Sequence, residues 1–382
     1  MSTTESTSAT TGSGATPTTL RGTAGALLTE HDAVLLDLDG VVYVGPHAVP
    51  HAADSLTAAA GGGARLAYIT NNASRPPATV AAHLRELGVP AEDGDVVTSA
   101  QAAARHLAQR LAPGSPVMLV GGAGLREALE LAGLTPVASL ADGPAAVVQG
   151  FSPDTSWARL AEATHAVRSG LLWVATNLDA TVPTPGGPAP GNGLLVQLVA
   201  SAAGRRPDVV CGKPERALFD EAVERLGARR ALVVGDRLDT DLQGARTAGL
   251  TGLLVLTGVT GVAELFAAGE HERPHLVGRD LRSLGDAHPA TVLEERDGAL
   301  TARCRGAEVR VATGAAEVTA AHGGPDGLDL LRAASEAVWR VRDAGLDERW
   351  GVDTATLLEP VARSVDAAPA AGGGHGAVGR GL

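Results

Sequence analysis

Short apolar runs alternate with amphipathic stretches from about residue 33 to residue 268. A short apolar run that ends in glycine or polar residues is typical of a buried strand, whereas apolar positions at helical spacing indicate a helix. Predicted strands cover residues 33–36, 65–70, 117–120, 145–150, 171–176, 208–210, 231–234 and 251–256. Predicted helices cover residues 51–60, 76–87, 100–111, 125–132, 155–169, 214–226 and 262–268. This alternation predicts an α/β fold with parallel sheets.

The pattern changes near residue 288. Two short apolar runs flank Asp297-Gly298, which is a strong signal for a β-hairpin. A third apolar run follows at residues 308–312, and residues 328–344 have the spacing of an amphipathic helix. We therefore expect a separate small α+β module over residues 288–362.

The remaining boundaries follow from composition and from the order of the elements. Residues 1–28 and 363–382 are rich in small and polar residues and bury too little apolar surface to become ordered, so we expect unstructured tails. Residues 99–210 form a second α/β unit, which separates residues 29–98 from residues 211–286.

Composition narrows the classes of function. The 382 residues suffice for two or three domains, and with 45% hydrophobic but 2% aromatic residues the core must be built from Ala, Val and Leu. A net charge of −12 disfavours nucleic acid and anionic membranes as partners. Two cysteines, Cys211 and Cys304, make no disulfide framework. With no membrane-length apolar run and no secretory signal, we expect a cytoplasmic protein.

Two carboxylates follow the first predicted strand. Residues i and i+2 of an extended segment point the same way, so Asp37 and Asp39 should face one small volume. Two close carboxylates repel each other unless a cation lies between them, and Mg²⁺ suits such oxygen ligands. Gly40 allows a tight turn. The alternative interpretation is a solvated Asp turn, and the motifs later in the chain distinguish between the two.

Polar groups also follow later strands. Thr70, Asn71 and Asn72 end the strand at 65–70 just before a helix start, where a hydroxyl and two amides can form an anion cradle. A turn with an Asx cap is the alternative for this stretch. Gly121-Gly122-Ala123-Gly124 follows another strand but lacks the G-x-G-x-x-G spacing, so we expect a plain strand-to-helix turn there.

Three further charged residues complete the pattern. Lys213 follows the strand at 208–210, and taken alone it would be a surface charge. Asp236 follows the strand at 231–234, and Asp241 can begin the next helix, where negative charge is favourable. Because carboxyl ends of parallel strands share one edge, we expect all these groups to meet there.

Acids, a hydroxyl-amide turn and a lysine at one sheet edge suit phosphoryl transfer. Asp37 would attack phosphorus as the nucleophile, and Asp39 would act first as general acid and then as general base. Thr70, the amides of Asn71 and Asn72, and Lys213 would hold the phosphoryl oxygens. Magnesium would neutralise the repulsion between a carboxylate and a phosphate dianion.

This set resembles the haloacid dehalogenase superfamily of phosphatases, whose four motifs occur here in order. The resemblance implies a three-layer Rossmann-like core with an α/β cap (C2 type) inserted after the second motif, because the interval from Asn72 to Lys213 is long. It also implies Mg²⁺ on Asp37, on the main-chain carbonyl of Asp39 and on Asp236. Asp241 would support the metal without touching it.

Further motifs are similar to those of the class IIA branch, which includes the NagD, p-nitrophenyl phosphatase and phosphoglycolate phosphatase group. These motifs are residues 70–72, 175–179, 190–193 and 212–214. The C-terminal module adds a resemblance to bacterial glycerol-3-phosphate phosphatases with a GNAT-like (acetyltransferase-like) domain. Residues 303–308 are only a fragment of a pyrophosphate loop, so we expect that module to be structural or regulatory.

The resemblance implies an enzyme that hydrolyses a small phosphorylated metabolite, with glycerol 3-phosphate as the leading substrate. Val182 stands where vitamin B6 phosphatases carry His, which disfavours pyridoxal phosphate. Phosphoglycolate, a nucleotide or a sugar phosphate remain alternative substrates, and a catalytically quiet phosphate sensor is the alternative of another class. The sequence leaves a homodimer open.

Overall fold

The structure is a computed structural model that describes residues 19–184, 186–321 and 323–367. Its contacts divide the chain into two compact units. The larger unit consists of Ala24–Thr260 and Ala268–Ala287. Of the described residues, the smaller unit takes in 19–23, Gly261–Ala267 and 288–367. Within the described residues, no helix is long and apolar enough to cross a membrane.

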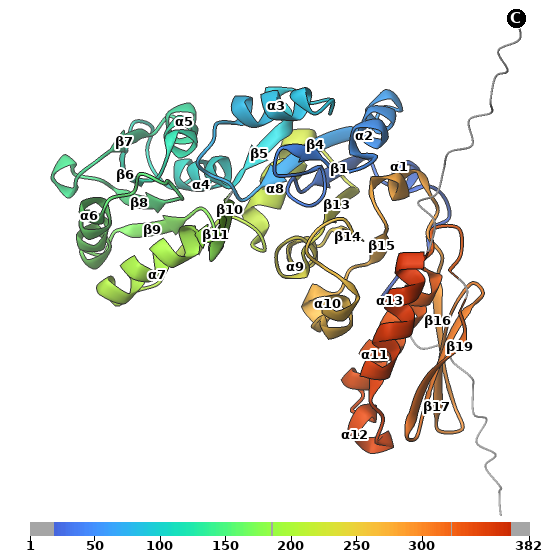
Figure 1. Cartoon of the computed structure of the whole chain (residues 1–382). Coiled ribbons are helices and arrows are strands. Elements are labelled where there is room, and N and C mark those ends of the chain that lie inside the picture. The colour runs from blue at the N-terminus through green and yellow to red at the C-terminus, as the bar shows by residue number, and fades with distance from the viewer. Residues whose placement is uncertain (1–18, 185, 322, 368–382) are drawn as a thin grey trace, which may run out of the picture. The chain divides into compact units, whose positions relative to one another are not determined.

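A six-stranded parallel sheet forms the centre of the larger unit (Figure 1). Its strands, in spatial order, are β15 (Leu276–Gly278), β14 (Thr251–Val255), β13 (Ala231–Gly235), β1 (Ala33–Leu36), β4 (Arg65–Thr70) and β5 (Val96–Thr98). In β1 the register pairs Leu36 with Val234 on one side and with Tyr68 on the other. The carboxyl ends of β1, β13 and β4 are therefore level with one another.

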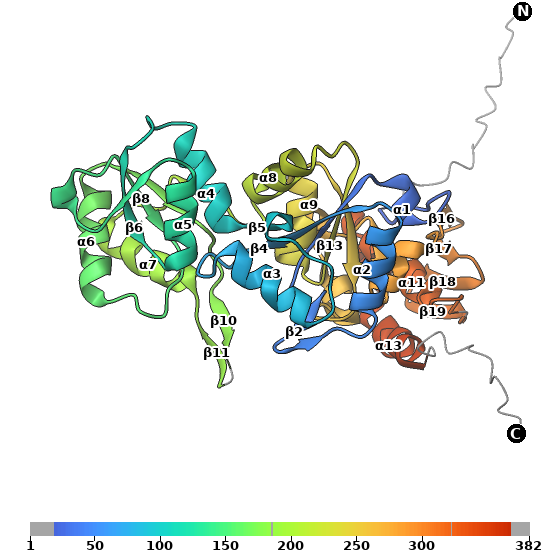
Figure 2. The same ribbon diagram turned by 90° about the horizontal axis from the view of Figure 1, so that it is seen from above.

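Helices cover both faces of this sheet, because side chains of a strand alternate between the faces. Leu35 and Val233 pack with α8 (Arg216–Leu226) and α9 (Gln243–Thr247), whereas Leu36 and Val234 pack against the opposite layer. That layer contains α2 (Ala52–Gly61) and α3 (Pro77–Glu86), and Figure 2 shows the two layers on either side of the strands. The α/β fold with a three-layer core is thus confirmed.

A second sheet of five parallel strands lies between β5 and α8 in the sequence. Its order is β12 (Val209–Val210), β9 (Leu172–Ala175), β8 (Ala146–Gln149), β6 (Pro116–Val120) and β7 (Thr135–Val137). One face packs with α4 (Ser99–Ala108) and α5 (Ala123–Leu131), and the other with α6 (Trp157–Arg168) and α7 (Asn192–Ala203). We call this inserted α/β unit the cap.

The smaller unit contains a four-stranded antiparallel meander. Its elements are β16 (Thr291–Arg296), β17 (Ala299–Cys304), β18 (Ala307–Ala312), β19 (Ala315–Ala320), α11 (Asp329–Asp343), α12 (Leu346–Trp350) and α13 (Leu358–Ala367). The predicted hairpin is present, with positive φ at Asp297 and Gly298. The predicted pyrophosphate-loop fragment is instead the β17–β18 hairpin turn, in which Arg303 pairs with Glu308. Its GNAT-like character stays a prediction.

Several predicted boundaries were wrong. Helix α10 (Val262–Ala267) groups with the smaller unit, because Trp339 Nε1 donates to the carbonyl of Leu265 at 2.9 Å. The predicted tail over residues 1–28 is too long, since Leu20 and Leu27 are buried. The C-terminal tail likewise begins inside α13. The rest of both predicted tails, residues 1–18 and 368–382, lies outside the described residues.

The cap also contains elements that the sequence pattern did not indicate. A hairpin is formed by β10 (Thr181–Thr184) and β11 (Gly187–Pro190), in a stretch where we predicted no strand. The apolar stretch after it forms α7, which buries Val196 and Val199. A further short helix, α1 (Leu27–Glu30), precedes the central strand β1.

Candidate active site

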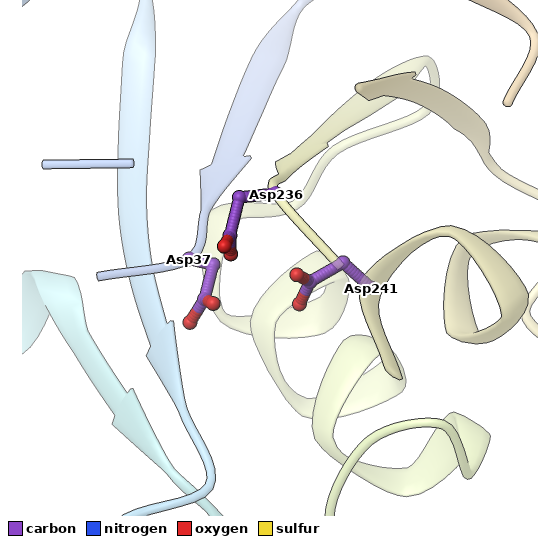
Figure 3. Close-up of side chains that lie close together, drawn as sticks. All are labelled: Asp37, Asp236 and Asp241. Carbon is purple, nitrogen blue, oxygen red and sulfur yellow. The ribbon is translucent and has the colours of Figure 1, made fainter. Parts of the chain in front are cut away.

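Three carboxylates converge at the carboxyl ends of the two central strands. Asp37 follows β1 and Asp236 follows β13, while Asp241 comes from the short π-helical turn Leu238–Leu242. One carboxylate oxygen from each lies within 4.8 Å of those of the others, and Figure 3 shows the three side chains directed at one space. The predicted convergence is therefore observed for Asp37, Asp236 and Asp241.

Lys213 joins this cluster as a buried cation. Its Nζ lies 2.6 Å from an oxygen of Asp37 and 2.6 Å from an oxygen of Asp241. We expected Lys213 to follow a strand of the same sheet as the acids. Instead it follows β12, which belongs to the cap sheet. The residue reaches the site on the connection that returns from the cap to α8. Strand register therefore does not position Lys213, and other contacts must hold its main chain in place.

The cluster carries more negative than positive charge. Three buried carboxylates face one ammonium group, which leaves an excess of two negative charges if all are ionised. Asp236 accepts a hydrogen bond from the Val259 amide at 2.7 Å through Oδ2, but its buried Oδ1 has no protein partner. An oxygen-lined, doubly negative space with an unpartnered carboxylate oxygen fits a divalent cation such as Mg²⁺.

The backbone around Asp236 leaves no room for other side chains. Gly40 has a φ of 81°, and a Cβ on it would lie 2.5 Å from Asp236 Oδ2. A Cβ on Gly258 would lie 2.0 Å from the same oxygen. The hydroxyl of Thr257 donates to the Gly40 carbonyl at 2.6 Å, which ties the two loops together. Asp236 is therefore held between two glycines in a fixed orientation.

Burial and mutual repulsion raise the pKa values of all three acids. Desolvation and the neighbouring Asp241 raise the pKa of Asp236 to about 6, and desolvation and Asp37 raise the pKa of Asp241 to about 6. Desolvation also raises the pKa of Asp37, against the opposing effect of Lys213. Burial acts against the Lys213 ammonium, but Asp241 and Asp37 outweigh it and raise its pKa. Binding a cation would relieve this repulsion.

Asp39 is not one of the three acids that converge, although it follows Asp37 by two residues. Its side chain is exposed, but partial desolvation in its recess still raises its pKa, with Lys213 and Arg75 acting in the opposite direction. A raised pKa suits a carboxyl group that must donate a proton. Tyr43 and His83 stand nearby with ring centroids 5.2 Å apart in an edge-to-face contact. Desolvation and the charge of Asp39 raise the pKa of Tyr43.

The polar turn after β4 is built differently from its prediction. Thr70 is buried, and its Oγ1 accepts a hydrogen bond from the Asn72 amide at 3.1 Å. Asn72 Oδ1 in turn accepts from the Ser74 amide at 2.9 Å, so the alternative Asx turn is present. Thr70 and Asn72 remain candidates for contact with phosphate.

The Asn71 side chain forms hydrogen bonds within the protein. Its Oδ1 accepts from the Lys213 amide at 2.8 Å, and its Nδ2 donates to the Lys213 carbonyl and to Asp179 Oδ1, each at 3.1 Å. All of these contacts are within the protein, so the predicted role of the Asn71 side chain as a phosphate ligand does not fit this geometry. Asn71 holds the main chain of Lys213, which explains how that residue reaches the acids.

Sequence reasoning missed the cap residues that support Asn71. Asn177 Nδ2 donates to the Asn71 carbonyl at 2.7 Å, and Asn177 Oδ1 accepts from the Asp179 amide at 3.1 Å. Asn192 Nδ2 donates to the Asn177 carbonyl at 2.8 Å. These residues come from the end of β9 and the start of α7. Their signal in the sequence was their place in the motifs at residues 175–179 and 190–193, which were noted as family resemblances without a role for the individual residues.

Family models match both parts of the central fold. A model described as haloacid dehalogenase-like hydrolase matches residues 34–135, and a HAD-hydrolase-like model matches residues 210–284. The two matches contain every one of the acids, the Thr70 turn and Lys213.

Individual relatives extend this similarity to most of the chain. The chain is 45% identical over 328 residues to a D-glycerol 3-phosphate phosphatase of Mycobacterium tuberculosis, covering 84% of this chain and 89% of the relative. It is 40% identical over 275 residues to a glycerol-3-phosphate phosphatase of Gallus gallus, covering 66% of this chain and 88% of that relative.

A solved structure gives the same comparison in three dimensions. The crystal structure of a glycerol phosphate phosphatase from Mycobacterium tuberculosis in complex with magnesium superposes with a TM-score of 0.74 at 43% identity. The match covers 85% of this chain and 99% of that one. The likeness thus extends beyond the two segments that the family models match.

Proposed function

The chain belongs to the haloacid dehalogenase-like hydrolase family, and on that premise we propose that it is a magnesium-dependent phosphatase acting on glycerol 3-phosphate. The observation that carries the proposal is the 45% identity, over 84% of the chain, to an enzyme with this named substrate.

The oxygen ligands and the negative charge of the site suit a magnesium ion. Asp37, Asp236 and the main-chain carbonyl of Asp39 would hold the ion, and Asp241 would fix Lys213 beside it. The two excess negative charges and the unpartnered Asp236 Oδ1 supply the charge and the ligand that a divalent cation needs. When bound, magnesium would offset the repulsion between the Asp37 carboxylate and an incoming phosphate dianion.

The chain's own residues then account for the reaction. An oxygen of Asp37 attacks phosphorus and forms an aspartyl-phosphate, while the bond from phosphorus to the ester oxygen breaks. Asp39 gives its proton to the departing alcohol oxygen. A water molecule next attacks the phosphorus of the aspartyl-phosphate and passes a proton to Asp39, which releases inorganic phosphate and restores Asp37. Lys213 and Thr70 stabilise negative charge on the phosphoryl oxygens.

A phosphate-release screen tests this proposal. Purified protein is assayed on glycerol 3-phosphate, phosphoglycolate, nucleoside monophosphates and sugar phosphates, with magnesium and with a chelator. We expect the highest kcat/KM on glycerol 3-phosphate, and no turnover without a divalent cation.

The matched variant is Asp37→Asn, which keeps the shape of the side chain but removes the nucleophile. We expect kcat to fall by at least about 10³-fold, as for other removed nucleophiles, with an unchanged circular dichroism spectrum. Asp220→Asn, an exposed change on α8, should retain full activity. Turnover by the Asp37 variant would reject the assigned nucleophile, and a better substrate in the screen would replace glycerol 3-phosphate.

A further inference from the structure

The glycine-rich turn of the cap lies against the loop that follows Thr70. We expected residues 121–124 to be a plain strand-to-helix turn, and they do connect β6 to α5. The structure adds a contact with the central fold: the amide of Gly124 donates to the carbonyl of Ser74 at 3.0 Å. One of the free N–H groups at the start of α5 is thus satisfied by a loop distant in the sequence.

At Gly124 the approach is too close for any other residue. A Cβ on Gly124 would lie 2.5 Å from the carbonyl oxygen of Arg75 and 3.0 Å from that of Ala73. A Cβ on Gly122 would lie 3.3 Å from the carbonyl oxygen of Ser74. Three successive carbonyl oxygens therefore meet the start of a nine-residue helix, where the helix dipole is positive.

Glycine at this place needs a reason, because it is among the least favourable residues inside a helix. Gly124 is the second residue of α5, and alanine there would favour the helix if the cap were considered alone. The close contact with residues 73–75 supplies the reason. Gly124 serves the contact with the loop rather than the stability of α5.

The same loop is held from its other side by the site itself. Asn72 Oδ1 accepts hydrogen bonds from the amide and the hydroxyl of Ser74, at 2.9 and 2.8 Å. The Asn72 amide donates in turn to Thr70 Oγ1. A chain of contacts therefore runs from Gly124 through Ser74 and Asn72 to Thr70.

We propose that Gly122 and Gly124 of the cap are positioning residues, which hold the loop at residues 72–75 so that Thr70 and Asn72 are set to receive the phosphoryl group. The inference rests on the proposed phosphatase function and adds to it a part of the cap that touches no substrate. It predicts that the contact controls affinity for phosphate itself, whatever alcohol the ester carries.

The test compares three single glycine-to-alanine variants. Gly124→Ala forces the loop away, Gly122→Ala needs a shift of only a few tenths of an ångström, and Gly61→Ala is a control at which a Cβ meets nothing within 4 Å. For each protein we measure KM and kcat on glycerol 3-phosphate, and the affinity for inorganic phosphate by titration calorimetry with magnesium present.

We expect Gly124→Ala to raise KM and the dissociation constant of phosphate by about 10-fold or more, Gly122→Ala by less, and Gly61→Ala not at all. Unchanged phosphate affinity in Gly124→Ala would overturn the inference. A lower melting temperature with wild-type KM and phosphate affinity would overturn it too, because that result marks a merely structural glycine. Should the wild type hydrolyse no ester, the proposed function fails, and the phosphate titrations still decide this inference.

Discussion

At the scale of single residues, the site concentrates like charges in a place where water cannot screen them. Asp236 and Asp241 are almost fully buried, and Lys213 is the cation that both Asp37 and Asp241 contact. Such an arrangement is unfavourable for the protein alone, because buried charges need partners. The free energy that the metal-free fold gives up here is recovered when a divalent cation binds.

The stability of the metal-free protein should therefore fall as the pH rises through the pKa values of these acids. Burial raises the pKa of Asp236 and of Asp241 to about 6, from an ordinary value of 3.8 in the unfolded chain. The folded state thus binds these protons more tightly, and their stabilising contribution is complete below about pH 3.8 and is lost as the pH rises through about 6. At about 1.4 kcal/mol per pKa unit, the loss is about 3 kcal/mol for each of the two groups.

Magnesium should reverse that loss, so its effect on the melting temperature must grow with pH. We expect a clearly larger increase at about pH 7.5 than at about pH 5, measured by thermal melting with magnesium or chelator. Asp236→Asn, which removes one of the titrating groups and one ligand, should reduce the difference between the two pH values. An equal magnesium effect at both would show that these acids do not control stability.

At the scale of elements, the cap and the central fold share a network of buried amides. Asn177, at the end of β9, holds the carbonyl of Asn71, and Asn71 holds both main-chain polar groups of Lys213. The position of Lys213 thus depends on contacts between the cap and the central fold. Register within either sheet would not be sufficient to place it.

Asn177→Ala tests that dependence. The change leaves the Asp179 amide without its partner and removes one of two donors to the Asn71 carbonyl, which still accepts from Ser99 Oγ at 2.7 Å. An unsatisfied buried group costs about 1–3 kcal/mol. We expect the free energy of unfolding to fall by that amount in urea titrations, and kcat to fall because Lys213 is less well held. The matched control is Gln197→Ala on the exposed side of α7, which should change neither quantity. Unaltered stability and kcat in Asn177→Ala would show that this network does not position Lys213.

The elements differ in how well the sequence predicted them. The apolar runs of β1, β4 and β13 are typical of buried strands, and the sequence predicted them correctly. The positions of Asp37 and Asp236 followed from these strands, because each acid comes directly after one of them. Hairpin β10–β11 was missed because prolines at 183, 188 and 190 argue against a strand. The tasks of Asn71 and Gly124 depend on partners more than 40 residues away, and no local pattern encodes such contacts.

At the scale of the whole molecule, the smaller unit is assembled from three separate stretches of chain. Helix α10 comes from the middle of the chain, and α11 from its C-terminal part. Trp339 donates to the carbonyl of Leu265, and Arg342 Nη1 donates to that of Phe266 at 3.1 Å. At the other end of the chain, the Leu20 amide donates to Glu336. The C-terminal module is therefore not a separable appendage.

Removing residues 288–382 should leave α10 without its partners. Leu265 and Phe266, which are buried in the full chain, would then be exposed to water. We expect a melting temperature lower by several degrees, about 5 °C or more, and a greater tendency to aggregate in light scattering. A truncated version that also carries Leu265→Ser and Phe266→Ser should aggregate less. Identical melting and scattering of the truncated and full-length proteins would show that α10 does not need the C-terminal module.

The interleaved chain path also has a consequence for biosynthesis. The ribosome releases α10 well before it has made α11, so the apolar side of that helix must wait unprotected while the intervening strands are translated. Nascent protein at this stage already contains all the acids of the site, from Asp37 to Asp241, but not the helix that contacts α10. Cells that make this enzyme quickly would need chaperones most during that interval.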